Sequence, residues 1–240
     1  MKKALLPALG LCLFLFAALP AAADIVVGLP ADPGTGNCYP LSCSYSSEYQ
    51  QVYTHSLFPG TMTITGLQFF NTQYNAGVGT LGTGTWTFSL STTSADWNTL
   101  STNFAGNLGA DNTTVFSGDL FQSWAFGDTL TINFTTPFTY NPADGNLLLD
   151  VVSSSSSPNG SIYFDTNGYN NGGYDGNTIF GRNYCPGGGG CGSDGTVNAG
   201  YGLVTGFITG NPTTPEPASL LLMGSGLLML GGYVRRKLAR

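Results

Sequence analysis

The chain has 240 residues, 42% of them hydrophobic and only 8% charged, with a formal net charge of −6 at pH 7. Six of its seven lysines and arginines lie near the two ends, so residues 24–214 hold Arg182 as their single cation against twelve carboxylates, a net charge near −11. This charge repels phosphate backbones and anionic lipid, which excludes nucleic-acid binding and leaves divalent cations as natural counter-charges. Scattered aspartates that keep an otherwise uncharged protein soluble are the plainer explanation.

The first 23 residues have the pattern of a secretory signal peptide. Lys2 and Lys3 precede the apolar run 4–18, and Pro20 is followed by three alanines. A basic start, an apolar centre and a small-residue end are read by the Sec machinery and cut by signal peptidase, so we expect the mature chain to begin at Asp24.

Residues 24–210 are predicted to form one β domain. Gly, Ser, Thr, Asn, aromatic and β-branched residues dominate this region, which disfavours helix and favours strands joined by turns. Apolar and polar residues alternate within several segments, the pattern of antiparallel strands with one buried face. The predicted strands are 25–29, 50–57, 62–69, 86–90, 130–134, 147–152, 161–165 and 203–208, with one short helical turn within 94–104 capped by Ser94.

About eight short strands in one domain imply an all-β fold, an antiparallel β-sandwich that is jelly-roll-like. The glycine-rich stretch 79–84 has no lysine after it and no helix to carry a phosphate site. We therefore interpret it as a hairpin loop.

Four cysteines remain after the signal peptide: Cys38, Cys43, Cys185 and Cys191. An even number in an exported protein suggests disulfides, with three possible connectivities. The local pairing of Cys38 with Cys43 and Cys185 with Cys191 is preferred because each pair brackets turn-forming residues. A site of four thiolates is the alternative, but the C-x-x-C spacing usual for zinc is missing.

The stretch 165–177 is the best candidate for binding chemistry. Oxygen-bearing side chains at alternate positions on a glycine-permitted loop suit Ca²⁺, although the EF-hand spacing is not met. The candidate ligands are Asp165, Asn167, Asp175 and Asn177. Aromatic faces among amides also suit sugar rings, and the candidate glycan contacts are Tyr163, Tyr169, Tyr174 and Tyr184. A plain polar loop with partly buried tyrosine anchors is the alternative for both. No other cofactor is indicated.

No catalytic constellation is evident, so we expect a protein that is not an enzyme. His55 is the only histidine, and neither a nucleophile elbow nor a Gly-x-Ser-x-Gly motif lies near it. A glycosidase needs two carboxyls, one with a raised pKa, and Glu48 is the only glutamate of residues 24–214.

The C-terminus combines three unlike features in a fixed order. A linker, residues 211–217, ends in Pro215, Glu216 and Pro217, where the prolines hold the glutamate in extended backbone. The uncharged run 218–234 reaches about 25 Å as a helix, barely enough to cross a bilayer. The tail 235–240 holds Arg235, Arg236, Lys237 and Arg240, which the positive-inside bias keeps cytoplasmic.

This order resembles the PEP-CTERM sorting signal of Gram-negative bacteria. The resemblance implies recognition by a membrane protease-transpeptidase, the exosortase, with removal of the helix and release or attachment of the mature protein at the surface. It also implies association with exopolysaccharide or biofilm matrix. A chance Pro-Glu-Pro hinge before an ordinary tail anchor is the alternative.

Two functions follow as hypotheses. The first is a non-enzymatic exported protein of the cell surface or extracellular matrix, held at the inner membrane as a precursor. The second is a carbohydrate-binding module, with or without Ca²⁺. No pair of glycines in 218–234 falls four apart, so no G-x-x-x-G packing face is present and a transient handle fits better than a lasting anchor.

Overall fold

The computed structural model describes residues 24–42, 47–73, 79–153, 157–159, 162–170, 173–174, 177–186 and 191–210. Within them the fold is all-β with antiparallel strand pairing, as predicted, and its two short helices are 3-10 turns at His55–Leu57 (η1) and Phe104–Asn107 (η2). The predicted signal peptide and the 218–234 segment lie outside the described residues, as does the linker. No helix of the described residues is long and apolar enough to cross a membrane.

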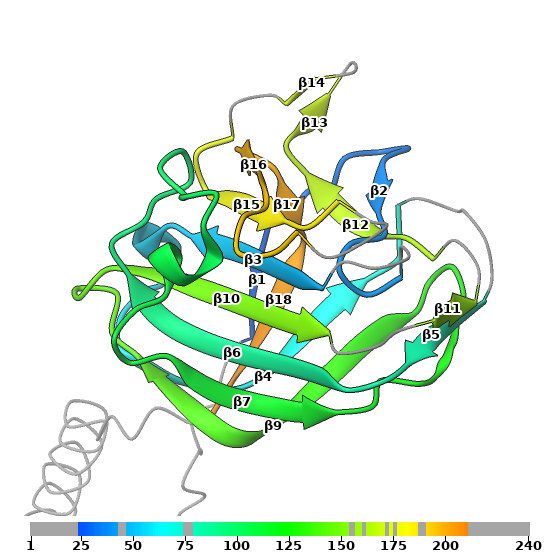
Figure 1. Cartoon of the computed structure of the whole chain (residues 1–240), viewed down its shortest axis with the longest axis horizontal. Coiled ribbons are helices and arrows are strands. Elements are labelled where there is room, and N and C mark those ends of the chain that lie inside the picture. Colours follow the sequence, from blue (N-terminus) through cyan, green and yellow to red (C-terminus); the bar gives the residue numbers. More distant parts are fainter. Residues whose placement is uncertain are drawn as a thin grey trace, which may run out of the picture.

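Two sheets form the body of the domain (Figure 1). The first has the order β1-β18-β4-β9, with bounds Ile25–Val27, Thr205–Thr209, Met62–Phe70 and Thr129–Tyr140. The second has the order β16-β15-β3-β10-β6-β7, with bounds Thr196–Ala199, Phe180–Tyr184, Glu48–Tyr53, Asn146–Ser153, Trp86–Thr93 and Thr113–Gly118.

Three smaller sheets complete the described fold. One has the order β11-β5-β8 (Ser157–Asn159, Gly79–Thr83 and Ser123–Trp124), so the predicted hairpin loop 79–84 is mostly a strand. Another has the order β17-β12-β2 (Gly202–Leu203, Phe164–Asn167 and Gly36–Asn37). The last pairs β13 with β14 (Tyr169–Asn170 and Gly173–Tyr174).

The two large sheets share one hydrophobic core. The ring of Tyr53 on β3 meets that of Phe207 on β18 edge-on at 5.0 Å, and its hydroxyl lies 2.8 Å from the hydroxyl of Thr205. Phe58, just after η1, packs edge-on against both Tyr140 and Phe207. Burying such rings removes about 150–250 Å² of surface each from water, so this layer dominates the energetics of the domain.

Two further local predictions were wrong. The strand predicted over 50–57 ends at Tyr53, and 55–57 is the 3-10 turn η1. The turn predicted within 94–104 with Ser94 as its cap begins at Phe104 instead, because the side chain of Asn103 accepts the Gly106 N–H at 3.1 Å.

Candidate functional site

A pocket of about 310 Å³ lies where the small β17-β12-β2 sheet meets the edge of the second large sheet. Figure 1 shows β2, β12, β13, β15 and β17 gathered in the upper part of the view, away from β7 and β9. The residues that line the pocket are Gly34, Thr35, Gly36, Tyr163, Tyr169, Arg182 and Tyr201.

One wall of the pocket is a loop fastened to β12 and β13. The carboxylate of Asp32 accepts the Tyr169 backbone N–H at 2.7 Å, and the Asp32 N–H donates to the Thr166 carbonyl at 2.8 Å. The amide of Asn167 donates to the Pro30 carbonyl at 2.7 Å. These bonds hold the loop that carries Gly34, Thr35 and Gly36 against the strand that leads to Tyr169.

Two glycines allow the tyrosines to approach each other. Gly168 has φ +96° and Gly200 has φ +71°, backbone conformations that residues with a side chain rarely adopt. A Cβ added to Gly168 would lie 1.8 Å from the Gly200 carbonyl oxygen, so the two turns pack backbone against backbone. The residues that follow them, Tyr169 and Tyr201, therefore meet edge-on with ring centroids 5.9 Å apart.

Arg182 is the charged residue of the pocket and is only 5% exposed. It lies on β15, opposite Gln51 of β3 and Asn198 of β16, and its Nε donates to Asn198 Oδ1 at 2.9 Å. The guanidinium carbon lies 4.1 Å from the ring centre of Tyr184 and 4.3 Å from that of Tyr201. Its Nη1 is buried without a hydrogen-bond partner.

The groups beneath Arg182 are neutral. Burial raises the pKa of Tyr49, which the charge of Arg182 lowers only in part, so Tyr49 keeps its proton. Its hydroxyl donates to Gln51 Oε1 at 2.5 Å, and Gln51 exchanges two further hydrogen bonds with the Leu203 backbone. The oxygen of the Gln51 amide thus accepts two hydrogen bonds and its nitrogen donates one, all within the core.

The four predicted glycan contacts do not all line the pocket. Tyr163 and Tyr169 line the pocket, and Tyr184 packs on Arg182. Tyr174 pairs with Tyr169 in the β13–β14 ladder, and its side chain lies outside the described residues. The prediction missed Tyr201 and gave Arg182 no site, although a single cation among twelve carboxylates was a usable signal.

The predicted calcium ligands stay a prediction. Asp165 is buried, and its carboxylate accepts the Thr72 N–H and hydroxyl and the Gln73 N–H at 2.6–3.0 Å. Asn177 donates to Asn167 Oδ1, and Asp175 lies outside the described residues. No cluster of three His, Cys, Asp or Glu suited to a metal occurs in the described part of the chain. The carboxylate of Asp165 thus holds the segment that follows β4.

The disulfide Cys185–Cys191 is confirmed, with a Cα–Cα distance of 5.5 Å. It closes the loop that follows β15, three residues after Arg182. Cys38 is disulfide-bonded too, while its predicted partner Cys43 lies outside the described residues.

Two carboxyls, Glu48 and Asp150, meet between β3 and β10. Burial, the charge of Asp150 and a hydrogen bond to it raise the pKa of Glu48 to about 7. Burial also raises the pKa of Asp150, which accepts a hydrogen bond from Gln50 at 3.1 Å. Carboxyls in direct hydrogen bonding are closer than the separation of about 5 Å or more that glycosidases use, so the pair has the geometry of a shared proton. His55, the only histidine of the chain, contacts an amide, with its Nδ1 3.0 Å from Asn146 Oδ1.

Comparison with known proteins concerns the C-terminal tail. The model of the PEP-CTERM protein-sorting motif matches residues 213–237, which include Pro215, Glu216 and Pro217. A search among curated proteins found none that matches the chain. The motif implies export and processing by exosortase. The chain is therefore one that carries the PEP-CTERM protein-sorting motif, as its tail residues predicted.

Proposed function

We propose that this chain is a non-enzymatic protein of the cell surface or extracellular matrix whose β domain binds carbohydrate. The sorting motif supports an exported precursor that exosortase processes. The association with exopolysaccharide or biofilm is our inference from the kind of protein that carries this motif. The route begins with the Sec machinery and signal peptidase at residues 1–23 and uses 218–234 as a transient membrane handle.

The tyrosine pocket is the observation that carries the binding function. Sugar rings present apolar C–H faces and a rim of hydroxyls, so they are held by aromatic faces together with polar donors and acceptors. Tyr163, Tyr169 and Tyr201 supply three rings around one cavity, and Thr35 supplies a hydroxyl. A volume of about 310 Å³ is at the lower end of small-molecule sites, the size of one sugar unit of a chain.

The strand order supports a jelly roll, a fold that lectin domains share. Eight strands divide equally between the two large sheets. In chain order they are β1, β3, β4, β6, β7, β9, β10 and β18. They give β1-β18-β4-β9 facing β3-β10-β6-β7, and β15 and β16 extend the second sheet beyond β3. We infer that this extension is what creates the pocket, because Arg182 lies on it.

Calorimetry tests the binding function. The exported protein, purified from its host, is titrated with the exopolysaccharide of that host, with and without Ca²⁺. We expect the titration to give a saturable heat of binding. Tyr169→Ala should lower the affinity about tenfold, since one stacked ring contributes on the order of 1–1.5 kcal/mol. Phe121→Ala is the matched control, because Phe121 is an aromatic residue 58% exposed that does not line the pocket.

Two results would contradict the proposal. Titrations that release no heat of binding, both with and without Ca²⁺, would rule out carbohydrate binding. Turnover of a glycan or peptide by the purified protein, lost on substitution of one carboxylate such as Asp150, would make the chain an enzyme.

A further inference from the structure

The charge of Arg182 lacks an anion within the contacts that the structure gives it. Those contacts are the amide oxygen of Asn198 and the faces of Tyr184 and Tyr201, and none is negatively charged. Nη1 has no hydrogen-bond partner at all. The only cation of residues 24–214 is thus buried in a strongly acidic domain, and none of the contacts that the structure describes for it is a carboxylate.

Burying a cation without a counter-ion is costly, and protein interiors rarely tolerate it unless the group is used. Two tyrosine faces offset part of that cost through cation–π attraction. Together with the Nε bond to Asn198, these ring contacts hold the guanidinium in place. A guanidinium that is fixed and incompletely hydrogen-bonded is prepared to receive two oxygens of one anion.

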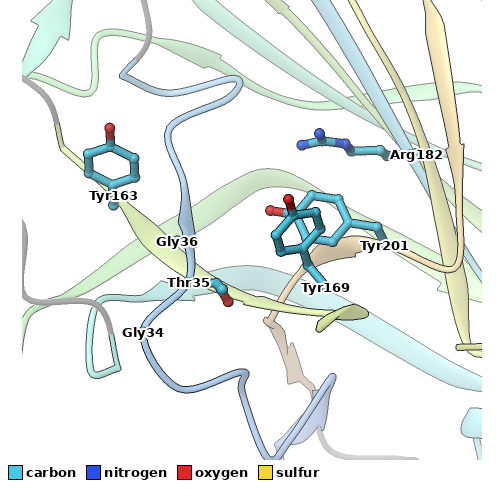
Figure 2. Close-up of a pocket in the computed structure, with 7 residues that line it drawn as sticks. All are labelled: Gly34, Thr35, Gly36, Tyr163, Tyr169, Arg182 and Tyr201. Carbon is cyan, nitrogen blue, oxygen red and sulfur yellow. The ribbon is translucent and has the colours of Figure 1, made fainter. Parts of the chain in front are cut away.

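Figure 2 shows where this guanidinium points. It extends from β15 toward the space between Tyr163 on one side and Tyr169 and Tyr201 on the other. A ligand that enters the pocket therefore meets a cation and aromatic faces at once. The carboxylate of Asp32 accepts a hydrogen bond from the backbone N–H of Tyr169.

We propose that Arg182 makes the tyrosine pocket selective for acidic sugars, with the carboxylate of a uronic acid unit on the guanidinium and the sugar ring against the tyrosines. This proposal rests on the carbohydrate-binding function proposed above and names its substrate class. A carboxylate presents two oxygens that the fork of a guanidinium can bind together, through two parallel N–H···O bonds. The repulsion of acidic polymers by the net charge near −11 is largely screened beyond about 8 Å, the Debye length at physiological salt, so the contact with Arg182 decides the binding of a single acidic unit.

The test compares an acidic sugar with its uncharged ester and with a sugar that carries a different anionic group. The exported protein is titrated with an oligogalacturonate, with the same oligomer as its methyl ester, and with an oligosaccharide whose only charged groups are sulfate esters. We expect the free acid to bind about 10-fold to 100-fold more tightly than the ester, the range for one charge-assisted hydrogen-bonded pair. This comparison uses the unaltered protein, so it does not depend on a variant folding.

The matched variants are Arg182→Met and Arg182→Lys. Methionine keeps an apolar chain between the two rings and removes the charge, so we expect equal and weak affinity for acid and ester. Lysine keeps the charge without the planar fork, so we expect part of the preference to remain. Thermal unfolding of each variant shows that it is folded before its affinities are compared.

The outcomes separate this inference from the proposed function. Equal affinity of the unaltered protein for acid and ester would overturn the acidic-sugar inference and leave carbohydrate binding intact. Binding of the sulfated sugar alone would overturn the carboxylate assignment. A preference for the acid that survives Arg182→Met would overturn the role of Arg182. No binding of any sugar would remove the proposed function itself.

Discussion

Glu48 gives the sharpest prediction about stability. Burial and the neighbouring Asp150 raise its pKa from 4.5 to about 7, so the folded protein holds a proton that the unfolded chain releases. A pKa raised on folding means that the carboxyl favours the folded state fully below about pH 4.5, and that this stability is lost as the pH rises through 7. Stability should therefore fall between pH 5 and 8.

The full pKa difference corresponds to about 3.4 kcal/mol, because each pKa unit is about 1.36 kcal/mol. Glu48 is only half-buried, so screening by solvent reduces this to about 1–2 kcal/mol. For a domain of this size, we expect Tm to fall by about 3–6 °C between pH 5 and 8.

Thermal unfolding followed by circular dichroism at several pH values provides the assay. Glu48→Gln keeps the shape of the side chain and removes its titration, so the variant should lose most of the pH dependence. Asp24→Asn, which removes one exposed carboxylate, is the matched control and should keep the dependence. A Glu48→Gln variant with the pH profile of the unaltered protein would refute the reasoning.

Three further substitutions test the architecture of the site. Gly168→Ala should lower the free energy of unfolding by about 2–3 kcal/mol and abolish sugar binding, because the new Cβ faces a carbonyl oxygen 1.8 Å away; Gly60→Ala, which meets nothing within 4 Å, should be neutral in urea titrations. Cys191→Ser should cost about 2 kcal/mol by opening a short loop, and a reducing agent should lower the Tm of this variant less than that of the unaltered protein, because the disulfide of Cys38 remains in both. Asp165→Asn should cost about 1–3 kcal/mol, since its buried oxygens accept three hydrogen bonds, and an unchanged urea midpoint would contradict that assignment.

The strands that were predicted well are those with one buried face. Segments 62–69, 86–90 and 130–134 alternate apolar and polar residues, and they lie within β4, β6 and β9. Each packs its apolar residues on the shared core, so the period of two is visible in the sequence alone.

The strands that were missed lack this pattern for physical reasons. β7 is the outermost strand of its sheet and buries little besides Val115. β15 contains Gly181 and Arg182 and lies between β3 and β16, so its polar residues are buried on both faces and the alternation disappears. The glycines of 79–84 suggested a loop, yet that segment pairs with β8 and β11.

The candidate site was predicted only in part because it joins distant segments. Tyr163 and Tyr169 lie in one polar stretch and stood out by composition. Arg182 and Tyr201 reach them only through the β17-β12 pairing and the contact between Gly168 and Gly200. A single sequence shows neither long-range contact.

The exported, exosortase-processed state is the central claim, and it is tested most directly by intact-mass spectrometry of the protein recovered from outside the cell or from its surface. Processing at the PEP-CTERM motif predicts a chain that ends before the apolar run 218–234, without Arg235, Arg236 and Lys237, and removal of the predicted signal peptide makes it begin at Asp24. A recovered protein that still ends at Arg240 would contradict it.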